Sequence, residues 1–482
     1  MPRRTKIVAT LGPATDDPRL LDAMIAAGVD VVRLNLSHDG HVRHRERAER
    51  VRERAAAAGR DVAVLLDLQG PKIRVGRFRD GAVDLTVGDA FIIDAECPID
   101  GGDRARVGTT YPDLVTDLAA GDTLLLDDGA IELTVESVRG AAVHCRVLIG
   151  GPLSDNKGIN RKGGGLSAPA LTDKDRADIR FAAEIGADYL AVSFVRNGDD
   201  VRLARELFTE AGGAGGIVAK IERAEALSGI DDIIAAADAI MIARGDLGVE
   251  IGDAELPGVQ KDLISRARES NSVVITATQM MQSMIANAHP TRAEVFDVAN
   301  AVLDGTDAVM LSAETSIGRY PVKVVDAMHR ICEEAEKQRS ARRSTHRIDT
   351  VFGRVDEAIA MATMYTANHL GVKAIAALTE TGSTVKWMSR ISSGIPIYAP
   401  TRHIATRRKV KLFRGVYPVS FDVSNADIHE VNRDVIEVLL DHGIVRDGDL
   451  VIITKGDRSG VEGQTNIMKI MRVGEHRRLA DD

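Results

Sequence analysis

Charged and hydroxyl side chains lie at the ends of three apolar segments in the middle of the chain. Lys220 and Glu222 end the first segment, Gly245 and Asp246 follow the second, and Thr278 follows the third. Because side chains alternate along a strand, Lys220 and Glu222 point the same way. Asp246 comes just past the next strand, where it can share a hard divalent cation with Glu222. The three segments therefore predict one pocket for a divalent metal and a polyanionic substrate.

The other side chains of this group also have roles that their chemistry permits. Lys220 can face a phosphoryl group in transfer or a developing enolate oxygen. Gly245 has no side chain, so backbone N–H groups at the start of the next helix can hold a carboxylate. The Thr278 hydroxyl can bond such a carboxylate or relay a proton. The alternatives are a simple ion pair between Lys220 and Glu222 and a structural role for Thr278.

A second polar group follows two apolar segments near the N-terminus. Arg33 and Asn35 share one face of a segment, and Ser37 and His38 come directly after it. Arginine suits a phosphate, whereas the Asn and Ser oxygens suit a cation or a nucleotide phosphate. Arg74, after the Gly-Pro pair that follows the next segment, is a second phosphate candidate. His38 taken alone reads as a hydrogen-bonded surface residue.

The spacing of the apolar segments predicts a (β/α)8 TIM barrel. Eight segments have strand length, and helix-like stretches separate them. The parallel strands of such a barrel end at one rim, which would gather the reactive side chains. The strand candidates are Lys6–Thr10, Val29–Leu34, Val62–Asp67, Tyr189–Ser193, Ile217–Lys220, Ile240–Ala243, Val273–Thr276 and Ala308–Leu311.

Two further regions break the barrel pattern. Residues 71–167 contain short β-type runs between Gly-rich turns, which predicts a small β-barrel inserted after the third strand. An insertion there lies over the reactive rim, so we expect it to act as a lid. Residues 341–482 alternate strand and helix patterns, which predicts a doubly wound α/β domain. The catalytic barrel would then comprise residues 1–70 and 168–340.

Composition narrows the class of protein. The chain has 482 residues, too many for one compact core, and 44% of them are apolar. A net charge of −9 and an aromatic fraction of 3% give no reason to expect nucleic acid as a partner. Cys97, Cys145 and Cys332 lack metal-ligand spacing, which indicates a reduced protein of the cytoplasm. The sequence predicts no signal peptide and no membrane span.

Eight short motifs follow one another in a specific order. They begin at Lys6 (KIVATLGPA), Arg33 (RLNLSH), Ser154 (SDNKG), Ala219 (AKIE), Ala243 (ARGDLG), Ala277 (ATQM), Pro290 (PTRAE) and Ser312 (SAET). Each motif alone is weak, but in this order the chain resembles the pyruvate kinases over essentially its whole length. The resemblance implies phosphoryl transfer from phosphoenolpyruvate to ADP, which gives pyruvate and ATP and is the final step of glycolysis.

The same resemblance implies a role for each residue of the site. Glu222 and Asp246 would bind Mg²⁺, with Mn²⁺ as an alternative, and Lys220 would stabilise the phosphoryl group in transit and the enolate. Arg33 would contact the phosphoryl group, and Thr278, through water, would deliver the proton that completes pyruvate. The implied catalytic residues are Lys220, Thr278, Arg33 and Arg74. The substrate carboxylate would be seated by Gly245, Asp246 and Thr278. The nucleotide side would comprise Asn35, Ser37, His38, Arg74 and Lys157.

The region that binds a monovalent cation in part of this family differs here. In the K⁺-dependent branch, Asn, Ser, Asp and a Thr carbonyl hold K⁺, and a Glu lies close by. Asn35, Ser37 and Asp67 match that pattern, but Leu68 replaces the Thr and Lys72 replaces the Glu. The resemblance is therefore to the K⁺-independent branch. A tethered ammonium on Lys72 can supply the positive charge that K⁺ would otherwise bring. The alternative is that Lys72 points to solvent.

A turn in the last third of the chain predicts regulation. The turn follows a strand and opens a helix, so its hydroxyls, its glycine and the helix N-terminus could cradle an anion. We expect a phosphorylated metabolite to bind there as an allosteric activator, and the alternative is a plain capped turn. The resemblance also implies a homotetramer. The expected effector residues are Thr379, Thr381, Gly382, Ser383 and Thr384.

Two other functions fit parts of this pattern. A Mg²⁺-dependent barrel lyase or aldolase acting on pyruvate-type enolates would use the carboxylate pair, but it has no need of a nucleotide lid that carries Lys157. A sensor that only binds phosphorylated metabolites would have no need of an intact set of Lys220, Glu222, Asp246 and Thr278. An assay for pyruvate production from phosphoenolpyruvate and ADP separates the three functions.

Overall fold

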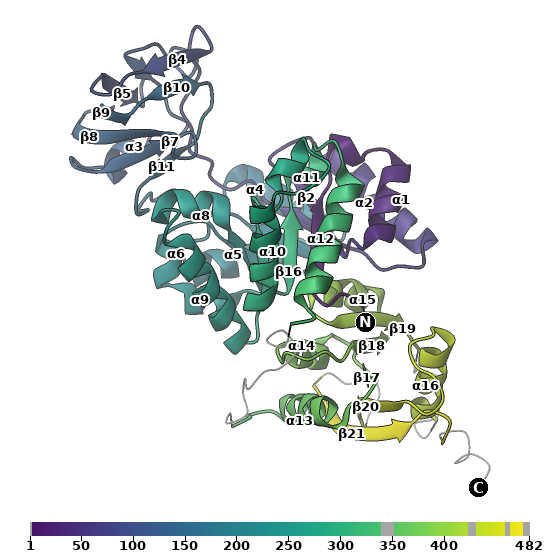
Figure 1. The fold of residues 1–482 in the computed structure, drawn as a ribbon. Coiled ribbons are helices and arrows are strands. Elements are labelled where there is room, and N and C mark those ends of the chain that lie inside the picture. Colours follow the sequence, from purple (N-terminus) through teal and green to yellow (C-terminus); the bar gives the residue numbers. More distant parts are fainter. Residues whose placement is uncertain (1, 339–350, 423–429, 458–462, 476–482) are drawn as a thin grey trace.

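The computed structural model shows three bodies along the chain (Figure 1). It describes residues 2–338, 351–422, 430–457 and 463–475. The helix-covered barrel lies in the middle, the inserted domain stands at one end of it, and the C-terminal domain lies at the other end (Figure 1). Among the described residues, no helix has the length and apolar character that crossing a bilayer requires.

Eight parallel strands close the barrel in the order β1-β16-β15-β14-β13-β12-β3-β2. Helices cover the outside and side chains fill the inside, so these strands are buried on both faces and read as nearly continuous apolar runs. Each predicted strand is confirmed to within two residues at either end. The strands are β1 Lys6–Thr10, β2 Val31–Asn35, β3 Ala63–Asp67, β12 Tyr189–Val192, β13 Gly216–Ile221, β14 Ala239–Ala243, β15 Val273–Ala277 and β16 Ala308–Leu311.

The barrel helices begin and end at recognisable capping residues. Thr172 caps α4: its hydroxyl accepts the Asp175 N–H, and the Asp175 carboxylate accepts the Thr172 N–H. Gly28 ends α1 with φ 117°, a left-handed conformation that favours glycine. The helices are α1 Pro18–Ala27, α2 His41–Ala57, α4 Asp173–Glu184, α5 Gly198–Glu210, α6 Glu225–Ser228, α7 Ile230–Ala236, α8 Arg244–Ile251, α9 Leu256–Glu269, α10 Arg292–Asp304, α11 Ala313–Ser316 and α12 Pro321–Ala335, with short 3₁₀ turns at Pro13–Thr15 and Gln282–Ile285.

The insertion between β3 and α4 is a β domain, as predicted. Its strands form a six-stranded sheet in the order β11-β7-β8-β9-β5-β6 and a two-stranded sheet of β10 and β4, around their own apolar core. The elements are β4 Ala82–Leu85, β5 Ala90–Asp94, β6 Arg106–Val107, α3 Leu114–Asp117, β7 Thr123–Leu126, β8 Ile131–Arg139, β9 Ala142–Ile149, β10 Gly151–Ser154 and β11 Ile159–Arg161.

The C-terminal domain is a five-stranded sheet with helices on both faces. The strand order is β19-β18-β17-β20-β21, with only β21 antiparallel to its neighbour. Alternate residues of β17 face opposite cores, so Ile375 packs with Met364 of α13 and Ala376 packs with Val435 of α16. The elements are α13 Val355–Leu370, β17 Ala374–Ala377, α14 Ser383–Ser389, β18 Ile397–Thr401, α15 Ile404–Lys409, β19 Val416–Ser420, α16 Val431–Asp441, β20 Leu450–Gly456 and β21 Thr465–Arg472, with a 3₁₀ turn at Val410–Leu412.

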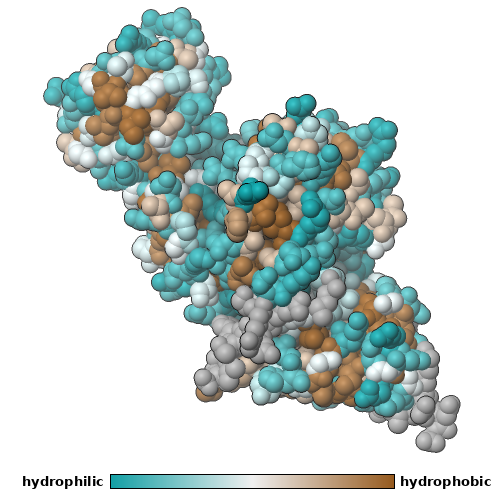
Figure 2. Space-filling model, viewed as in Figure 1, coloured by the Kyte–Doolittle hydropathy of each residue, from teal (hydrophilic) through white to brown (hydrophobic). Residues whose placement is uncertain are grey.

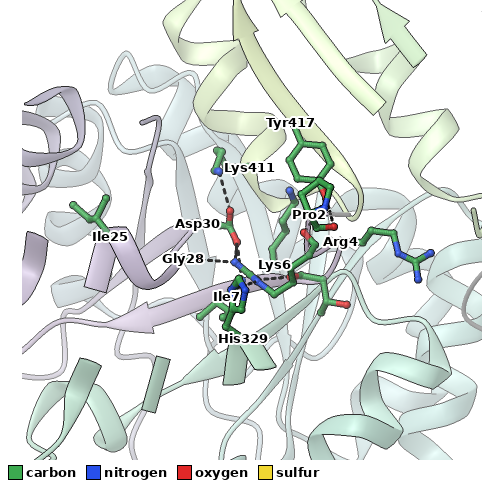
Figure 3. A network of polar contacts seen from close by, with 12 residues as sticks. Pro2, Arg4, Lys6, Ile7, Ile25, Gly28, Asp30, His329, Lys411 and Tyr417 are labelled. Atoms are coloured by element: carbon green, nitrogen blue, oxygen red, sulfur yellow. Dashed lines mark hydrogen bonds and ion pairs between the residues drawn. The ribbon is translucent and has the colours of Figure 1, made fainter. Parts of the chain in front are cut away.

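The C-terminal domain closes the barrel end that is opposite the reactive rim. Side chains from inside the barrel, such as Val8 and Met241, belong to the same apolar cluster as Val385 and Phe413 of the C-terminal domain. Buried charges flank this cluster, among them Lys6 and Asp30 (Figure 3). The barrel and the C-terminal domain therefore share one continuous core at this base.

Candidate active site

Lys220 lies at the centre of the polar cluster on the barrel rim. Its ammonium contacts Glu222 Oε1 at 2.8 Å and Asp67 Oδ1 at 3.2 Å, and it donates to Ser193 Oγ at 2.7 Å. Burial alone lowers the pKa of Lys220, but Asp67 and Glu222 outweigh it and the pKa is raised. The predicted contact between Lys220 and Glu222 is thus present, and the ammonium is held in one position by three oxygen partners.

Arg33 joins the cluster through Asp67. The Arg33 Nε donates to Asp67 Oδ2 at 2.6 Å, and its Nη1 donates to the Thr10 hydroxyl at 3.1 Å. Burial alone raises the pKa of Asp67, but Lys220 and Arg33 outweigh it and hold the pKa below its usual value. The side chains at the ends of β1, β2, β3 and β13 therefore form one charged network, as the barrel geometry requires.

Asp246 lies close enough to Glu222 to interact with its charge. Glu222 Oε2 accepts the Phe194 N–H at 2.8 Å, which fixes one carboxylate oxygen. Asp246 lies in the first turn of α8, where burial and the charge of Glu222 raise its pKa to about 6, against the lowering effect of Lys220 and Lys72. Two neighbouring carboxylates with excess negative charge suit a hard divalent cation with oxygen ligands.

Thr278 adopts an unusual backbone conformation next to Gly245. Its φ is 66°, rare for a β-branched residue, and its hydroxyl accepts the Gly245 N–H at 2.8 Å. Arg244 holds the turn through the backbone oxygens of Ala277 and Thr278 and through two bonds of 2.7 Å to Asp297. The structure thus brings Thr278 and Gly245 together, and their shared role in seating a carboxylate stays a prediction.

A cavity of about 260 Å³ separates the inserted domain from the barrel rim. Lys72, Arg74 and Lys157 line it from the inserted domain, and Asp246 lines it from the barrel. Lys157 pairs with Asp127 at 2.7 Å. The wall from the inserted domain thus adds Asp127 and Asp128 to its three cations, and the barrel wall adds Arg223, Glu225 and Glu250 to Asp246, so the cavity is lined by charges of both signs.

The remaining predicted nucleotide residues lie on the loop after β2. The Asn35 Oδ1 accepts the Ser37 N–H at 3.1 Å, and His38 is exposed while its carbonyl bonds His44. Among the described residues that line the cavity, Asn35, Ser37 and His38 are not present. The structure thus places the two halves of the proposed nucleotide side on different walls of the rim.

Sequence reasoning missed several residues that hold the site. Ser193 bonds both Lys220 and the Leu68 carbonyl, although its position at a strand end was the same signal that marked Thr278. Thr10, at the end of β1, carries that signal as well. Asp297 had no local signal, because it lies within α10 and meets Arg244 only in the folded chain.

The turn at residues 379–384 connects β17 to α14, as predicted. Gly382 has φ 86° and donates its N–H to the Thr379 hydroxyl at 2.9 Å, and the Thr381 and Ser383 hydroxyls are 3.0 Å apart. Thr384 points inward and bonds Thr465 at 2.8 Å. The structure therefore presents three hydroxyls near this turn, while Thr384 is used internally.

The fold and the site define a (β/α)8 barrel protein with a network of buried charges on its rim, beside a cavity of about 260 Å³. Two family models match the chain: the pyruvate kinase barrel domain over residues 2–325 and the pyruvate kinase α/β domain over residues 357–471. The chain belongs to the pyruvate kinase family.

Individual relatives match over nearly their full length. The chain is 57% identical to pyruvate kinase II of Salmonella typhimurium over 98% of this chain and 99% of the relative. It is 54% identical to the pyruvate kinase of Haemophilus influenzae over the same shares of the two chains. The crystal structure of a pyruvate kinase from Cryptosporidium parvum superposes with a TM-score of 0.90 at 34% identity, over 98% of this chain and 96% of that one.

Proposed function

We propose that this protein transfers the phosphoryl group of phosphoenolpyruvate to ADP and releases pyruvate and ATP. One observation carries the proposal: Lys220 is fixed between Asp67 and Glu222, beside Asp246, on a rim that faces a charged cavity. A coupled assay for pyruvate, with phosphoenolpyruvate, ADP and Mg²⁺ supplied, tests it. Pyruvate formation that needs ADP is the expected result. Pyruvate release without ADP would favour the lyase alternative, and binding without turnover would favour a sensor.

The charged network explains how the rim can act on a phosphoryl group. Lys220 and Arg33 keep their positions because Asp67 contacts both, so neither must reorganise when negative charge moves between oxygens. After the transfer, the enolate needs a proton. Thr278 lies across the rim with its hydroxyl next to the Gly245 N–H, where it can orient the carboxylate and relay that proton through water.

Glu222 and Asp246 are the residues that would hold Mg²⁺, and Mn²⁺ would suit the same oxygens. Their fit is supported by the raised pKa of Asp246, which burial causes first and the neighbouring charge of Glu222 second. Within the described part of the chain, no group of three or more His, Cys, Asp or Glu side chains forms a ready-made metal centre. The bound ion would polarise the substrate oxygens and neutralise charge as it develops.

We place ADP between the inserted domain and the barrel. Arg74 and Lys157 reach the cavity from the inserted domain, and Asn35, Ser37 and His38 would approach from the loop after β2. The inserted domain, assigned to residues 71–167, would then act as a lid that carries cationic side chains to the nucleotide phosphates.

We propose that turnover does not require K⁺. Lys72 is exposed at the mouth of the cavity, yet its charge interacts with Asp246 and Glu222. Partial desolvation lowers the pKa of Lys72 first, and among its neighbours Asp246 opposes that change while Arg74 and Lys220 add to it. These interactions favour an ammonium that is directed towards the site over one that is directed only to solvent.

We further propose an allosteric, homotetrameric enzyme of the cytoplasm. The hydroxyls of the 379–384 turn support an effector site for a phosphorylated metabolite. Figure 2 shows apolar surface over the region of α10, where Phe296 is 75% exposed beside a groove of about 750 Å³ between α10 and α12. Such a patch suits contact with another copy of the chain.

A further inference from the structure

The segment by which the inserted domain returns to the barrel is held by three charged side chains. Within this return segment, residues 159–167, Asn160 Nδ2 donates to Glu250 Oε1 at 3.4 Å. The Gly165 N–H donates to Glu225 Oε1 at 2.6 Å, and Arg223 Nη1 donates to the Leu166 carbonyl at 2.9 Å. These contacts fix the base of the inserted domain to the barrel.

The same barrel elements carry the two carboxylates proposed for the metal. Glu250 lies one helical turn after Asp246 on α8, and Arg223 and Glu225 follow Glu222 directly. Glu250 also bridges the two elements, because its Oε2 accepts the Ala224 N–H at 2.8 Å. Glu250 thus contacts the return segment and both of the elements that carry the proposed metal ligands.

The surroundings of Glu250 disfavour a charged carboxylate. It is only 6% exposed, and it faces Glu225 and Arg223 from the loop after β13 and Asn160 from β11. Burial raises its pKa to about 7, and Glu225 adds to the rise, whereas the Ala224 N–H, Asn160 and Arg223 oppose it. Near neutral pH the side chain therefore exists in both protonation states.

We propose that Glu250 is a positioning residue that sets the inserted domain against the metal-binding elements and thereby controls nucleotide affinity. The proposal rests on the proposed function, since it presumes that ADP binds beneath the inserted domain. Glu250 does not touch the reacting atoms in this scheme. It acts through Asn160 on one side and through the loop after Glu222 on the other.

The pH dependence of this effect has a defined direction. Because the observed arrangement raises the pKa of Glu250, it binds the proton more tightly than an arrangement in which Glu250 leaves Glu225 and meets water. Ionisation of Glu250 therefore destabilises this buried arrangement as a whole, because burial and the charge of Glu225 outweigh the Ala224 N–H and the Asn160 amide, which favour the ionised form. The KM for ADP should rise as the pH increases from 6 to 8, beyond the change caused by the titration of ADP itself.

The test uses the full-length enzyme with Glu250→Ala and Glu250→Gln, and Glu210→Ala on the exposed end of α5 as control. Glu250→Ala should raise the KM for ADP about tenfold, with a smaller change in kcat. Glu250→Gln keeps one oxygen acceptor and carries no charge, so its affinity for ADP should return to about that of the wild type. The ratio of the wild-type KM to the Glu250→Gln KM should rise as the pH increases through 7. Taking this ratio removes the titration of ADP itself, which is the same in both assays.

Hydrogen–deuterium exchange of residues 159–167 gives a readout that does not need turnover. Exchange there should increase in Glu250→Ala and remain at the wild-type level in Glu210→Ala. An inactive wild type would contradict the proposed function, while the exchange result would still test the contact. If the wild type is active and Glu250→Ala changes neither the KM for ADP nor this exchange, the positioning role is wrong. A pH-independent KM ratio would equally overturn it.

Discussion

The two ends of the barrel bury similar charges and use them differently. At the rim, Lys220 and Asp67 belong to a charged network next to a cavity of about 260 Å³, which Asp246 lines. At the base, Arg390 and Asp307 are each 1% exposed, and a cavity beside them holds about 20 Å³. The charges of the rim thus stand next to a space that a ligand could enter, whereas those of the base are enclosed between two domains.

The base charges join the barrel to the C-terminal domain. Asp30 pairs with Lys411 at 2.8 Å (Figure 3). It also pairs with Arg3 at 2.8 Å, and Lys6 donates to the Val416 carbonyl at 2.6 Å. These residues lie before or at the start of their strands, whereas the rim residues lie near or after the ends of theirs. If the proposed function holds, charge at the end of a strand serves chemistry in this barrel, and charge before a strand joins it to the C-terminal domain.

The largest effect expected is on stability and comes from the base. Arg390→Met leaves Asp307 buried without its two guanidinium contacts, so it should cost about 3–5 kcal/mol in the free energy of unfolding. Urea unfolding followed by the fluorescence of Trp387, the only tryptophan, reports on this region because Trp387 lies in α14. Arg19→Met removes an exposed pair and should leave the midpoint in place. Equal urea midpoints for Arg390→Met and Arg19→Met would show that the buried pair at the base stabilises the fold no more than an exposed pair does.

The next effect is on turnover and comes from the rim. Lys220→Met should lower kcat by roughly a hundred- to a thousandfold, about 3–4 kcal/mol, because a positioned charge is lost from the transition state. The Trp387 unfolding midpoint should fall less than in Arg390→Met, since Asp67 keeps its contact with Arg33 and water can reach the rim through the neighbouring cavity. Turnover at the wild-type level in Lys220→Met would contradict its role.

The rim was largely predictable and the base was not, for a physical reason. Strand ends can be found from local periodicity, and alternation along a strand already placed Lys220 beside Glu222. The base pairs join residues that are far apart in the chain: Arg390 and Asp307 are separated by 83 positions and Asp30 and Lys411 by a still larger interval. No local pattern marks such pairs. The proposed nucleotide and effector roles rest on the family resemblance and remain predictions.

A pH-dependent effect should follow from Lys6, whose ammonium is buried at the base and has no carboxylate in direct contact among the residues that the structure describes. Burial lowers its pKa to about 7; Lys411 and Arg3 add to this, and Asp30 and Glu336 oppose it. Below pH 7 the folded and unfolded chains both hold the proton, so the penalty of the buried charge is fully present. Between pH 7 and about 10 only the unfolded chain holds it, and stability should rise by about 1.4 kcal/mol per pH unit.

The slope, rather than the absolute stability, tests Lys6, because Lys6→Met also leaves the Val416 carbonyl without its donor. Urea midpoints at pH 7, 8 and 9 should rise less steeply in Lys6→Met than in wild type. Lys323→Met, on the exposed side of α12, should keep the wild-type slope. Parallel slopes for wild type and Lys6→Met would show that the base does not respond to protons.

A ligand bound at the effector turn, residues 379–384, would test whether the C-terminal domain changes the affinity of the rim for its substrate. A panel of sugar phosphates and nucleoside monophosphates should include one that lowers the apparent KM for phosphoenolpyruvate fivefold or more, a coupling of about 1–3 kcal/mol. Thr381→Glu adds a negative charge to the turn and should abolish this activation, while Thr209→Glu on α5 should not. An unmoved saturation curve across the panel, or activation that survives in Thr381→Glu, would refute the site.

The smallest effect expected is the response to K⁺, because Lys72 already supplies a positive charge at the rim. An ammonium about 4 Å from a K⁺ ion would repel it by roughly 1–4 kcal/mol for dielectric constants of 80 to 20. Turnover measured in tetramethylammonium salt and then in KCl at equal ionic strength should differ less than tenfold, and a larger rise would refute the idea. Lys72→Glu with Leu68→Thr should create a K⁺ requirement. Lys162→Glu, an equal charge change at an exposed site of the inserted domain, should not, which separates a local cation site from a general effect of charge.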